Sequence, residues 1–492
     1  MVLINNWPDL RQELLEGLHR LLPAASVISK REALRPYECD GLTAYRQLPG
    51  VVCLPYTVEQ VQAVLRLCHQ LNVPVVPRGA GTGLSGGALP HEQGVLLGLA
   101  RLDRIIEIDS LNRCAVVQPG VRNLALSEAA KPYGFYYAPD PSSQIACTIG
   151  GNVAENSGGV HCLKYGLTVH NVIGLKILTM QGELLEIGGK TLDAPGYDLL
   201  AVLCGSEGLL GVVVEVAVRL LPLPERAQVV LAAFDDVALA GEAVGRILSA
   251  GIIPAGMEMM DNLAIRATED FVHAGYPVEA AAILLVELDG ENREVSEQIF
   301  QVRQLLLTAG ATEVHTARDE AERLLFWKGR KAAFPAVGRL APDYYCMDGT
   351  IPRRRLSEVL ARIAELSREY DLPVANVFHA GDGNLHPLIL YDANQPGELA
   401  RTEALGGRIL QLCIEVGGTI TGEHGVGVEK IDQMCVQFHS AELAQFHALR
   451  AAFDPSGLLN PGKAVPTLHR CAEFGRMHVH AGQLPHPELE RF

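Results

Sequence analysis

Three clusters of glycine in the first half of the chain constrain its fold more than any other feature. The first covers residues 78–87 (RGAGTGLSGG), the second runs through residues 139–159, and the third covers residues 204–211 (CGSEGLLG). Glycine has no side chain, so it adopts positive φ angles and lets a ligand approach the backbone closely. The clusters therefore predict three loops that contact a polar ligand.

The first cluster predicts an anion site, but not one of the Rossmann type. It follows a predicted strand at residues 73–77 and contains the pattern G-x-G-x-x-G at residues 81–86. A Rossmann loop opens directly into a helix whose N-terminus faces the pyrophosphate. Here residues 88–94 (ALPHEQG) lead instead to another predicted strand. A nest of backbone N–H groups, with the Thr82 hydroxyl, fits the pattern better, and a glycine-rich surface loop without a ligand is the alternative.

Composition and charge exclude several classes of protein. The chain has 492 residues, 48% of them hydrophobic, which predicts two or three globular units rather than a disordered protein. Its net charge of −16 argues against nucleic-acid binding. No apolar run approaches 18 residues and the N-terminus is polar early, so we expect a cytoplasmic protein without a transmembrane segment. The eleven cysteines form no C-x-x-C pair, which favours reduced thiols and argues against an iron–sulfur cluster in this chain.

The second half of the chain predicts an α+β layer. The prolines at 222 and 224 suggest a domain boundary, and after them predicted strands alternate with amphipathic helices. The long helices are expected at about residues 236–251, 291–309, 353–370 and 397–416. This pattern is typical of an antiparallel sheet with helices packed on one face.

A second group of chemically active residues lies in this half. His379 and His386 flank a Gly-Asp-Gly-Asn turn, which predicts a hairpin that brings the two imidazoles together. Glu423 and His424 follow on a glycine-rich loop. Two histidines and one glutamate can hold a divalent metal (Zn, Mn or Fe) with an open position. The alternative is that the histidines make only structural hydrogen bonds and that the Glu-His pair is a surface turn.

The order of the glycine motifs resembles one family closely. PRGAGT (77–82), PDPSS (139–143), CTIGGN (147–152) and GSEG (205–208) are similar to the FAD-binding domain of the vanillyl-alcohol-oxidase-type flavoproteins. The branch is that of D-lactate dehydrogenase and the glycolate oxidase flavin subunit, and the resemblance runs from about residue 45 to 464. Leu209 departs from the family, which usually has threonine there. The first cluster has no histidine of the kind that attaches flavin covalently, so the FAD is expected to be non-covalent.

The resemblance implies roles for individual residues. His424 would be the general base, and His379, His386 and Glu423 would bind the metal. Arg330, with Lys331 as second choice, would bind the substrate carboxylate near the end of a helix that starts about residue 317; the alternative is a solvated helix terminus. The residues expected to contact FAD are Pro77, Arg78, Gly79, Gly81, Thr82, Gly83, Pro141, Ser142, Thr148, Gly151, Asn152, Ser157, Gly159, Glu207, Gly208, Val213 and Asn460.

The expected architecture is α+β: a two-part FAD-binding domain of the vanillyl-alcohol-oxidase type and an α+β substrate or cap domain. The expected units are a helical lead-in, the FAD-binding domain, the cap domain, a segment returning to the flavin and a peripheral tail, at residues 1–45, 46–224, 225–420, 421–466 and 467–492.

The expected activity is FAD-dependent oxidation of glycolate or another small (R)-2-hydroxy acid. The resemblance also implies a second flavin subunit and an iron–sulfur subunit, docked peripherally at the inner face of the cytoplasmic membrane. The alternatives are a D-lactate or broad D-2-hydroxy-acid dehydrogenase acting alone, and a subunit that only holds flavin within an assembly. A metal-dependent hydrolase would leave the three glycine clusters unexplained.

Overall fold

The computed structural model describes residues 6–191 and 195–467, so most of the tail predicted at 467–492 lies outside the described residues. The chain begins with helix α1 (Trp7–Leu21), which packs on helix α3 (Val58–Gln70). The Thr57 hydroxyl accepts a hydrogen bond from the backbone of Gln60 and caps α3. These helices cover a four-stranded sheet in the order β1 (Val27–Ile28), β2 (Val51–Cys53), β4 (Val95–Gly98) and β3 (Val75–Arg78).

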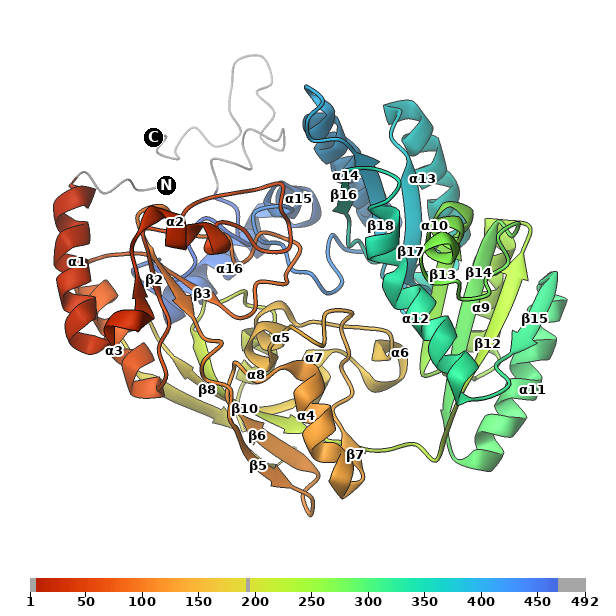
Figure 1. Cartoon of the computed structure of the whole chain (residues 1–492), viewed down its shortest axis with the longest axis horizontal. Helices are drawn as coiled ribbons and strands as arrows, with labels where there is room; N and C mark the ends of the chain where they lie inside the picture. Colours follow the sequence, from red (N-terminus) through yellow and green to blue (C-terminus); the bar gives the residue numbers. More distant parts are fainter. Residues whose placement is uncertain (1–5, 192–194, 468–492) are drawn as a thin grey trace.

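A second, five-stranded antiparallel sheet completes the first half of the molecule. Its order is β5 (Ile105–Asp109), β6 (Cys114–Val117), β10 (Val212–Arg219), β8 (Val172–Leu178) and β9 (Leu184–Gly188). Helices α4 (Asn123–Ala130), α5 (Ile149–Glu155) and α8 (Leu199–Leu203) share one apolar core with it. In Figure 1 this red-to-yellow half stands apart from the green-to-cyan half.

The second half is built on a seven-stranded antiparallel sheet. Its order is β15 (Glu313–Thr316), β12 (Arg226–Phe234), β14 (Ala282–Gly290), β13 (Gly256–Asp261), β17 (Val374–His379), β18 (Pro387–Tyr391) and β16 (Asp343–Cys346). Strands β17 and β18 are the hairpin predicted around the two histidines.

Helices cover both faces of this sheet, not one as the sequence pattern suggested. Alternate residues of β12 belong to two separate cores: Val230 and Ala232 to one, Val229 and Leu231 to the other. Helices α9 (Val237–Ser249), α11 (Asn292–Thr308) and α13 (Leu356–Tyr370) contribute to the first core, and α10 (Asn262–Val272) and α12 (Glu320–Val337) to the second. The continuous apolar character of the strands, buried on both sides, is the signal for this arrangement.

Helix α12 runs further than the sequence predicts. It continues through Pro335, so the segment of residues 327–331 lies inside the helix and not at its C-terminus. A proline inside a helix removes one backbone hydrogen bond. Apolar residues on both sides of Pro335, among them Ala333 and Val337, are buried in the core, and this packing offsets the loss.

After α14 (Glu398–Glu415) the chain returns to the first half. Helix α15 (Ile431–Gln437) packs on α14, and the chain that follows α16 (Ser440–Phe453) reaches strand β3, where Leu459 pairs with Val75. Figure 1 draws this segment in blue. The backbone N–H of Asn460 then donates to the carbonyl of Val75, 2.8 Å away. The loop of residues 421–427 therefore lies between the two halves.

No helix among the described residues is long and apolar enough to span a membrane. The nine cysteines from Cys39 to Cys413 are free thiols.

Candidate functional site

A cleft of about 380 Å³ joins the three glycine clusters to the loop of residues 421–427. Fifteen of the seventeen residues expected to contact FAD line it, and so do His386, Glu423, His424 and Lys331. Gly159, Asn460, Arg330 and His379 lie outside this lining. The structure therefore brings residues far apart in the chain into one cavity.

The first glycine loop has a backbone that requires glycine. Gly81 has a φ of +72°, and a Cβ there would lie 2.2 Å from the guanidinium of Arg78. That guanidinium donates to the carbonyl of Cys39 at 2.7 Å, so it is fixed beneath the loop. A Cβ on Gly79 would meet the hydroxyl oxygen of Thr148 at 2.5 Å. These contacts leave no room for a side chain at either glycine, and both glycines line the cleft.

The second cluster contributes the start of helix α5. Thr148 caps this helix by accepting a hydrogen bond from the backbone of Gly151 at 3.3 Å. Asn152 is buried, and its side-chain oxygen accepts from the amide of Asn123 at 3.1 Å. Gly159 has a φ of +154°, and its Cβ would lie 2.5 Å from the Asp140 carbonyl, so it shapes the turn behind the cleft.

Glu207 and Asn460 tie loops together. The two carboxylate oxygens of Glu207 accept from the backbone N–H groups of Val426 and Gly427, both at 2.7 Å. The Asn460 amide donates to the carbonyls of Gly87 and Glu207, at 2.9 and 2.7 Å. Glu207 also lines the cleft, and each of its oxygens takes a donor from the protein's own backbone, because a buried carboxylate requires donors.

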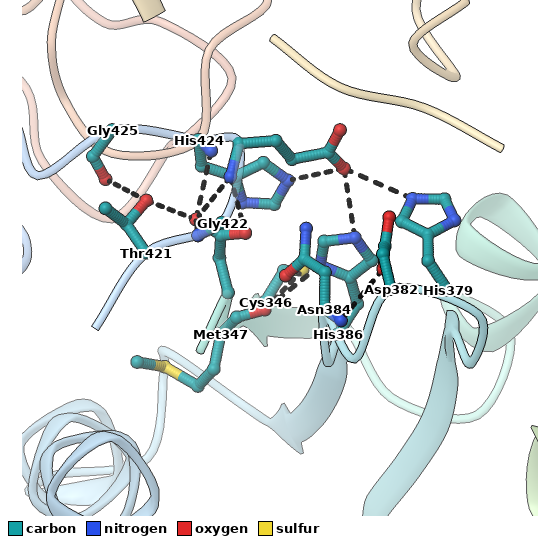
Figure 2. A network of polar contacts seen from close by, with 12 residues as sticks. Cys346, Met347, His379, Asp382, Asn384, His386, Thr421, Gly422, His424 and Gly425 are labelled. Atoms are coloured by element: carbon teal, nitrogen blue, oxygen red, sulfur yellow. Dashed lines mark hydrogen bonds and ion pairs between the residues drawn. The ribbon is translucent and has the colours of Figure 1, made fainter. Parts of the chain in front are cut away.

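The acid and histidines of the second half meet at one carboxylate oxygen. Oε1 of Glu423 lies 3.0 Å from Nε2 of His386 and 3.3 Å from Nε2 of His379. Nε2 of His424 is 3.9 Å from the same oxygen. Figure 2 shows the three imidazoles converging on this point. The other oxygen of Glu423 is buried and has no hydrogen-bond partner in the structure.

Burial and neighbouring groups shift the pKa values of the side chains in this cluster. Burial raises the pKa of Glu423, but hydrogen bonds from His379 and His386 outweigh it and hold that pKa well below its usual value. Burial lowers the pKa of His379, but the Glu258 carboxylate raises it well above the ordinary range. Burial lowers the pKa of His424 to about 4, so this imidazole is neutral at neutral pH.

Arg330 is not placed as the sequence predicts. Its guanidinium forms an ion pair with Glu258, with Nη2 and Nε both 2.7 Å from Oε2. The other oxygen of Glu258 lies 2.6 Å from Nδ1 of His379. Glu258 has a fully buried side chain and needs a counter-ion, which Arg330 supplies. Lys331, the second choice, is exposed and lines the cleft.

Two carboxylates of the site escaped the sequence reasoning. Glu258 is a fully buried acid between two methionines in strand β13, and an acid among apolar residues is a usable signal in the sequence. Asp348 follows β16 and accepts hydrogen bonds from the backbone of residues 422–424. Nothing in the sequence connects Asp348 with a loop more than seventy residues away.

Two sets of side chains could hold a metal among the described residues. His379, His386 and Glu423 offer ligand atoms within 4.8 Å of one another, and so do Cys346, His386 and His424. The first set fits a metal better, because the unpartnered Glu423 oxygen offers a free ligand. The Glu258 carboxylate on the far nitrogen of His379 is the usual outer partner of a metal-bound histidine.

Each half of the molecule matches a known protein family. A family described as "FAD binding domain" matches residues 49–188, and one described as "FAD linked oxidases, C-terminal domain" matches residues 223–464. Among solved structures, p-cresol methylhydroxylase has a TM-score of 0.77 at 17% identity, covering 94% of this chain and 98% of that one. This likeness shows the vanillyl-alcohol-oxidase-type fold.

Curated relatives are similar over nearly the whole chain. Glycolate oxidase subunit GlcD of Escherichia coli (strain K12) is 65% identical over 99% of this chain and 97% of its own. The subunit of the same name in Bacillus subtilis (strain 168) is 39% identical, covering 87% and 91%. A D-lactate dehydrogenase of Archaeoglobus fulgidus is 31% identical, covering 92% and 100%. The chain is an FAD-linked oxidoreductase and belongs to the family of the glycolate oxidase subunit GlcD.

Proposed function

We propose that the protein oxidises glycolate, or another small (R)-2-hydroxy acid, to the 2-oxo acid as the flavin subunit of a glycolate oxidase complex. The observation that carries this proposal is that His386, Glu423 and His424 line the same cleft as the glycine clusters. A redox cofactor and acid–base side chains therefore share one cavity. The 65% identical relative supports glycolate as the substrate, and the more distant D-lactate dehydrogenase makes D-lactate the second candidate.

The glycine clusters fit non-covalent FAD. Residues 78–83 would hold the cofactor through backbone N–H groups, because Gly79, Gly81 and Gly83 line the cleft without side chains. The second cluster, with Ser142 and Thr148, and the third, with Gly208, would complete the binding surface. The first loop has no histidine for covalent attachment. When bound, FAD accepts the hydride from the substrate Cα, which is chemistry that side chains cannot supply.

His379, His386 and Glu423 would hold a divalent metal. When bound, such a metal acts as a Lewis acid toward the substrate oxygens. Glu258 fixes the orientation of His379 from behind, and Arg330 fixes Glu258. Metal analysis of the purified protein, compared with a Glu423→Gln variant, tests this assignment.

His424 would take the hydroxyl proton of the substrate. Its ring is neutral at neutral pH, and its Nδ1 is buried without a hydrogen-bond partner in the structure. Lys331 would bind the substrate carboxylate, because it is the cation of the pair 330–331 that lines the cleft. Phe334, one turn further along α12, contributes an apolar wall that limits contact with water.

Electrons would leave through partner proteins. Among the described residues, the candidate metal sets are the two at this site, and neither is an iron–sulfur ligand set. A second flavin subunit and an iron–sulfur subunit, at the cytoplasmic face of the membrane, would provide the onward path. Co-purification of the tagged chain from its own cells tests for these partners.

A dye-linked assay of the isolated protein separates the candidate substrates. The protein should be yellow and should reduce an artificial electron acceptor faster with glycolate than with D-lactate or D-2-hydroxyglutarate. Faster turnover with D-lactate would favour a D-lactate dehydrogenase. A flavin-loaded protein inactive with all three acids would favour a subunit that only holds flavin.

A further inference from the structure

The loop that carries Glu423 and His424 is held from two sides by buried carboxylates. Asp348 belongs to the second half of the molecule, directly after strand β16, and its side chain is fully buried. Glu207 belongs to the third glycine cluster in the first half and is 5% exposed. We propose that Glu207 and Asp348 are positioning residues that jointly set the geometry of this loop for the reaction, an inference that rests on the proposed function.

Asp348 binds the first part of the loop. Its carboxylate accepts from the backbone N–H groups of Gly422, Glu423 and His424 at 3.1, 3.2 and 3.0 Å. It also accepts from the hydroxyl of Thr421 at 2.5 Å, and Figure 2 shows several of these contacts around Thr421 and Gly422. Three consecutive backbone groups on one carboxylate fix the direction in which the side chains of residues 423 and 424 leave the chain.

Glu207 binds the second part of the loop. Its Oε1 accepts from Val426 and its Oε2 from Gly427, so each oxygen takes one backbone N–H group. Glu207 itself has a φ of +51°, a region that non-glycine residues seldom adopt. The third glycine cluster thus directs a carboxylate toward the loop at the edge of the cleft.

The middle of the loop fits closely between these two anchors. Gly425 has a φ of +81°, and a Cβ there would lie 2.2 Å from Glu155 and 3.0 Å from Glu207. Its carbonyl accepts from the ammonium group of Lys430 at 2.9 Å. Lys430 also lies 3.7 Å from Asp348, so its charge balances one of the two anchors.

Through the loop, two acids that do not contact the substrate can affect the reaction. Hydrogen bonds from N–H groups to an ionised carboxylate are stronger than those between neutral groups. Because the anchors come from both halves of the molecule, the loop keeps a fixed place relative to the glycine clusters and to His386. A displacement of about 1 Å at a reacting group can cost roughly a hundredfold in rate.

Two variants and one matched control test the proposal on the FAD-loaded protein. Glu207→Gln and Asp348→Asn each keep the size of the side chain but replace one accepting oxygen with a donor. Asp261→Asn is the control, because Asp261 also accepts from backbone N–H groups, those of Ala264 and Asn376 at 3.0 and 2.8 Å, but outside the loop. If Asp348→Asn fails to fold, Glu207→Gln carries the test.

The first measurement is hydrogen exchange of a peptide covering residues 421–427. Both variants should exchange faster there by roughly ten- to a hundredfold, the factor for losing one charge-assisted hydrogen bond. Asp261→Asn should leave this peptide unchanged. Unaltered exchange in Glu207→Gln and Asp348→Asn would overturn the proposal, whatever the enzyme acts on.

The second measurement is the rate of flavin reduction at saturating glycolate, beside FAD affinity and the KM for the acid. The rate should fall roughly 10- to 10²-fold in both variants, and in Asp348→Asn with less than a few-fold change in FAD affinity and KM. Faster exchange with an unchanged rate would show that the anchors have no role in the reaction and would overturn the proposal. A wild-type protein whose flavin no 2-hydroxy acid reduces would instead overturn the proposed function and the catalytic part of this inference.

Discussion

His386 and His424 stack face to face, with ring centroids 4.9 Å apart and ring planes inclined by 9°. Burial lowers the pKa of His424 to about 4, and the neighbouring His386 acts in the same direction. Burial, aided by His386, therefore outweighs the Asp348 carboxylate and keeps the proposed base unprotonated next to the proposed metal ligands. Of the three histidines in the cluster, His424 is the one with a buried ring nitrogen that has no partner in the structure.

Replacing this base should slow the reaction without loss of cofactor. His424→Asn keeps a polar side chain but removes the ring nitrogens, and we expect flavin reduction to slow by roughly 10²–10⁴-fold, the usual contribution of a general base. Stopped-flow absorbance measures the rate, and the flavin spectrum after gel filtration measures occupancy. A rate within a few-fold of wild type would remove His424 from the mechanism.

Lys331 and Arg330 should have different roles. Lys331→Met should raise the KM for the acid about tenfold at a similar kcat, because it removes a charged donor from the cleft. Arg330→Met should instead lower the free energy of unfolding by about 3–5 kcal/mol, since it leaves the Glu258 carboxylate buried without its counter-ion. Steady-state kinetics and denaturant unfolding separate the two. An unchanged KM in Lys331→Met with a raised KM in Arg330→Met would return the carboxylate contact to Arg330.

Gly81 and Gly134 provide a matched pair for testing the flavin site. Both have a positive φ, +72° and +82°, so alanine strains both backbones by a similar amount, about 1–2 kcal/mol. A Cβ at Gly81 meets Arg78 beside the cleft, whereas a Cβ at Gly134 meets nothing within 4 Å. Gly81→Ala should lose FAD affinity, measured by fluorescence titration, and Gly134→Ala should not. Equal affinities would show that the first loop does not hold the flavin.

A second polar network joins the two halves of the molecule. Nδ1 of His161 lies 2.8 Å from Asp140, and Nε2 lies 3.2 Å from Glu287 of strand β14. Burial lowers the pKa of His161, but the two carboxylates raise it well above its usual value. Burial raises the pKa of Glu287, but His161, Arg323 and Trp327 lower it to about 2.

The sign of each shift predicts how stability changes with pH. The raised pKa of His161 means that its contribution is complete below its unfolded value of about 6.5 and is lost as the pH rises through the folded value. The depressed pKa of Glu287 means that its contribution is present above about 4.3 and is lost as the pH falls toward the folded value. In Glu287→Gln, Tm should therefore decline less steeply above pH 6.5 than in wild type. Parallel curves of Tm against pH would contradict this.

Much of the fold follows from local patterns. The polar cap at Thr57 and the turn between His379 and His386 both act over a few residues, and the hairpin lies where the sequence predicts it. The glycine clusters likewise indicate their loops, because positive φ angles leave few alternatives to glycine. The fold family follows from their order along the chain.

The partners of buried charges could not be predicted in this way. Arg330 and Glu258 are 72 residues apart, and Glu207 binds a loop more than two hundred residues away. Such pairs form because each buried charge needs a counter-ion or donors, and the sequence does not show which one the folded chain brings near. The continuation of α12 through Pro335 could not be predicted either, because tertiary packing outweighs the local tendency of proline to end a helix.

The most direct test of the central claim is anaerobic mixing of the FAD-loaded protein with glycolate while the flavin absorbance is recorded. We expect the yellow flavin to bleach in a single turnover, quickly in wild type and far more slowly in His424→Asn. A flavin that stays oxidised in the presence of glycolate and also of D-lactate, although FAD is fully bound, would contradict it.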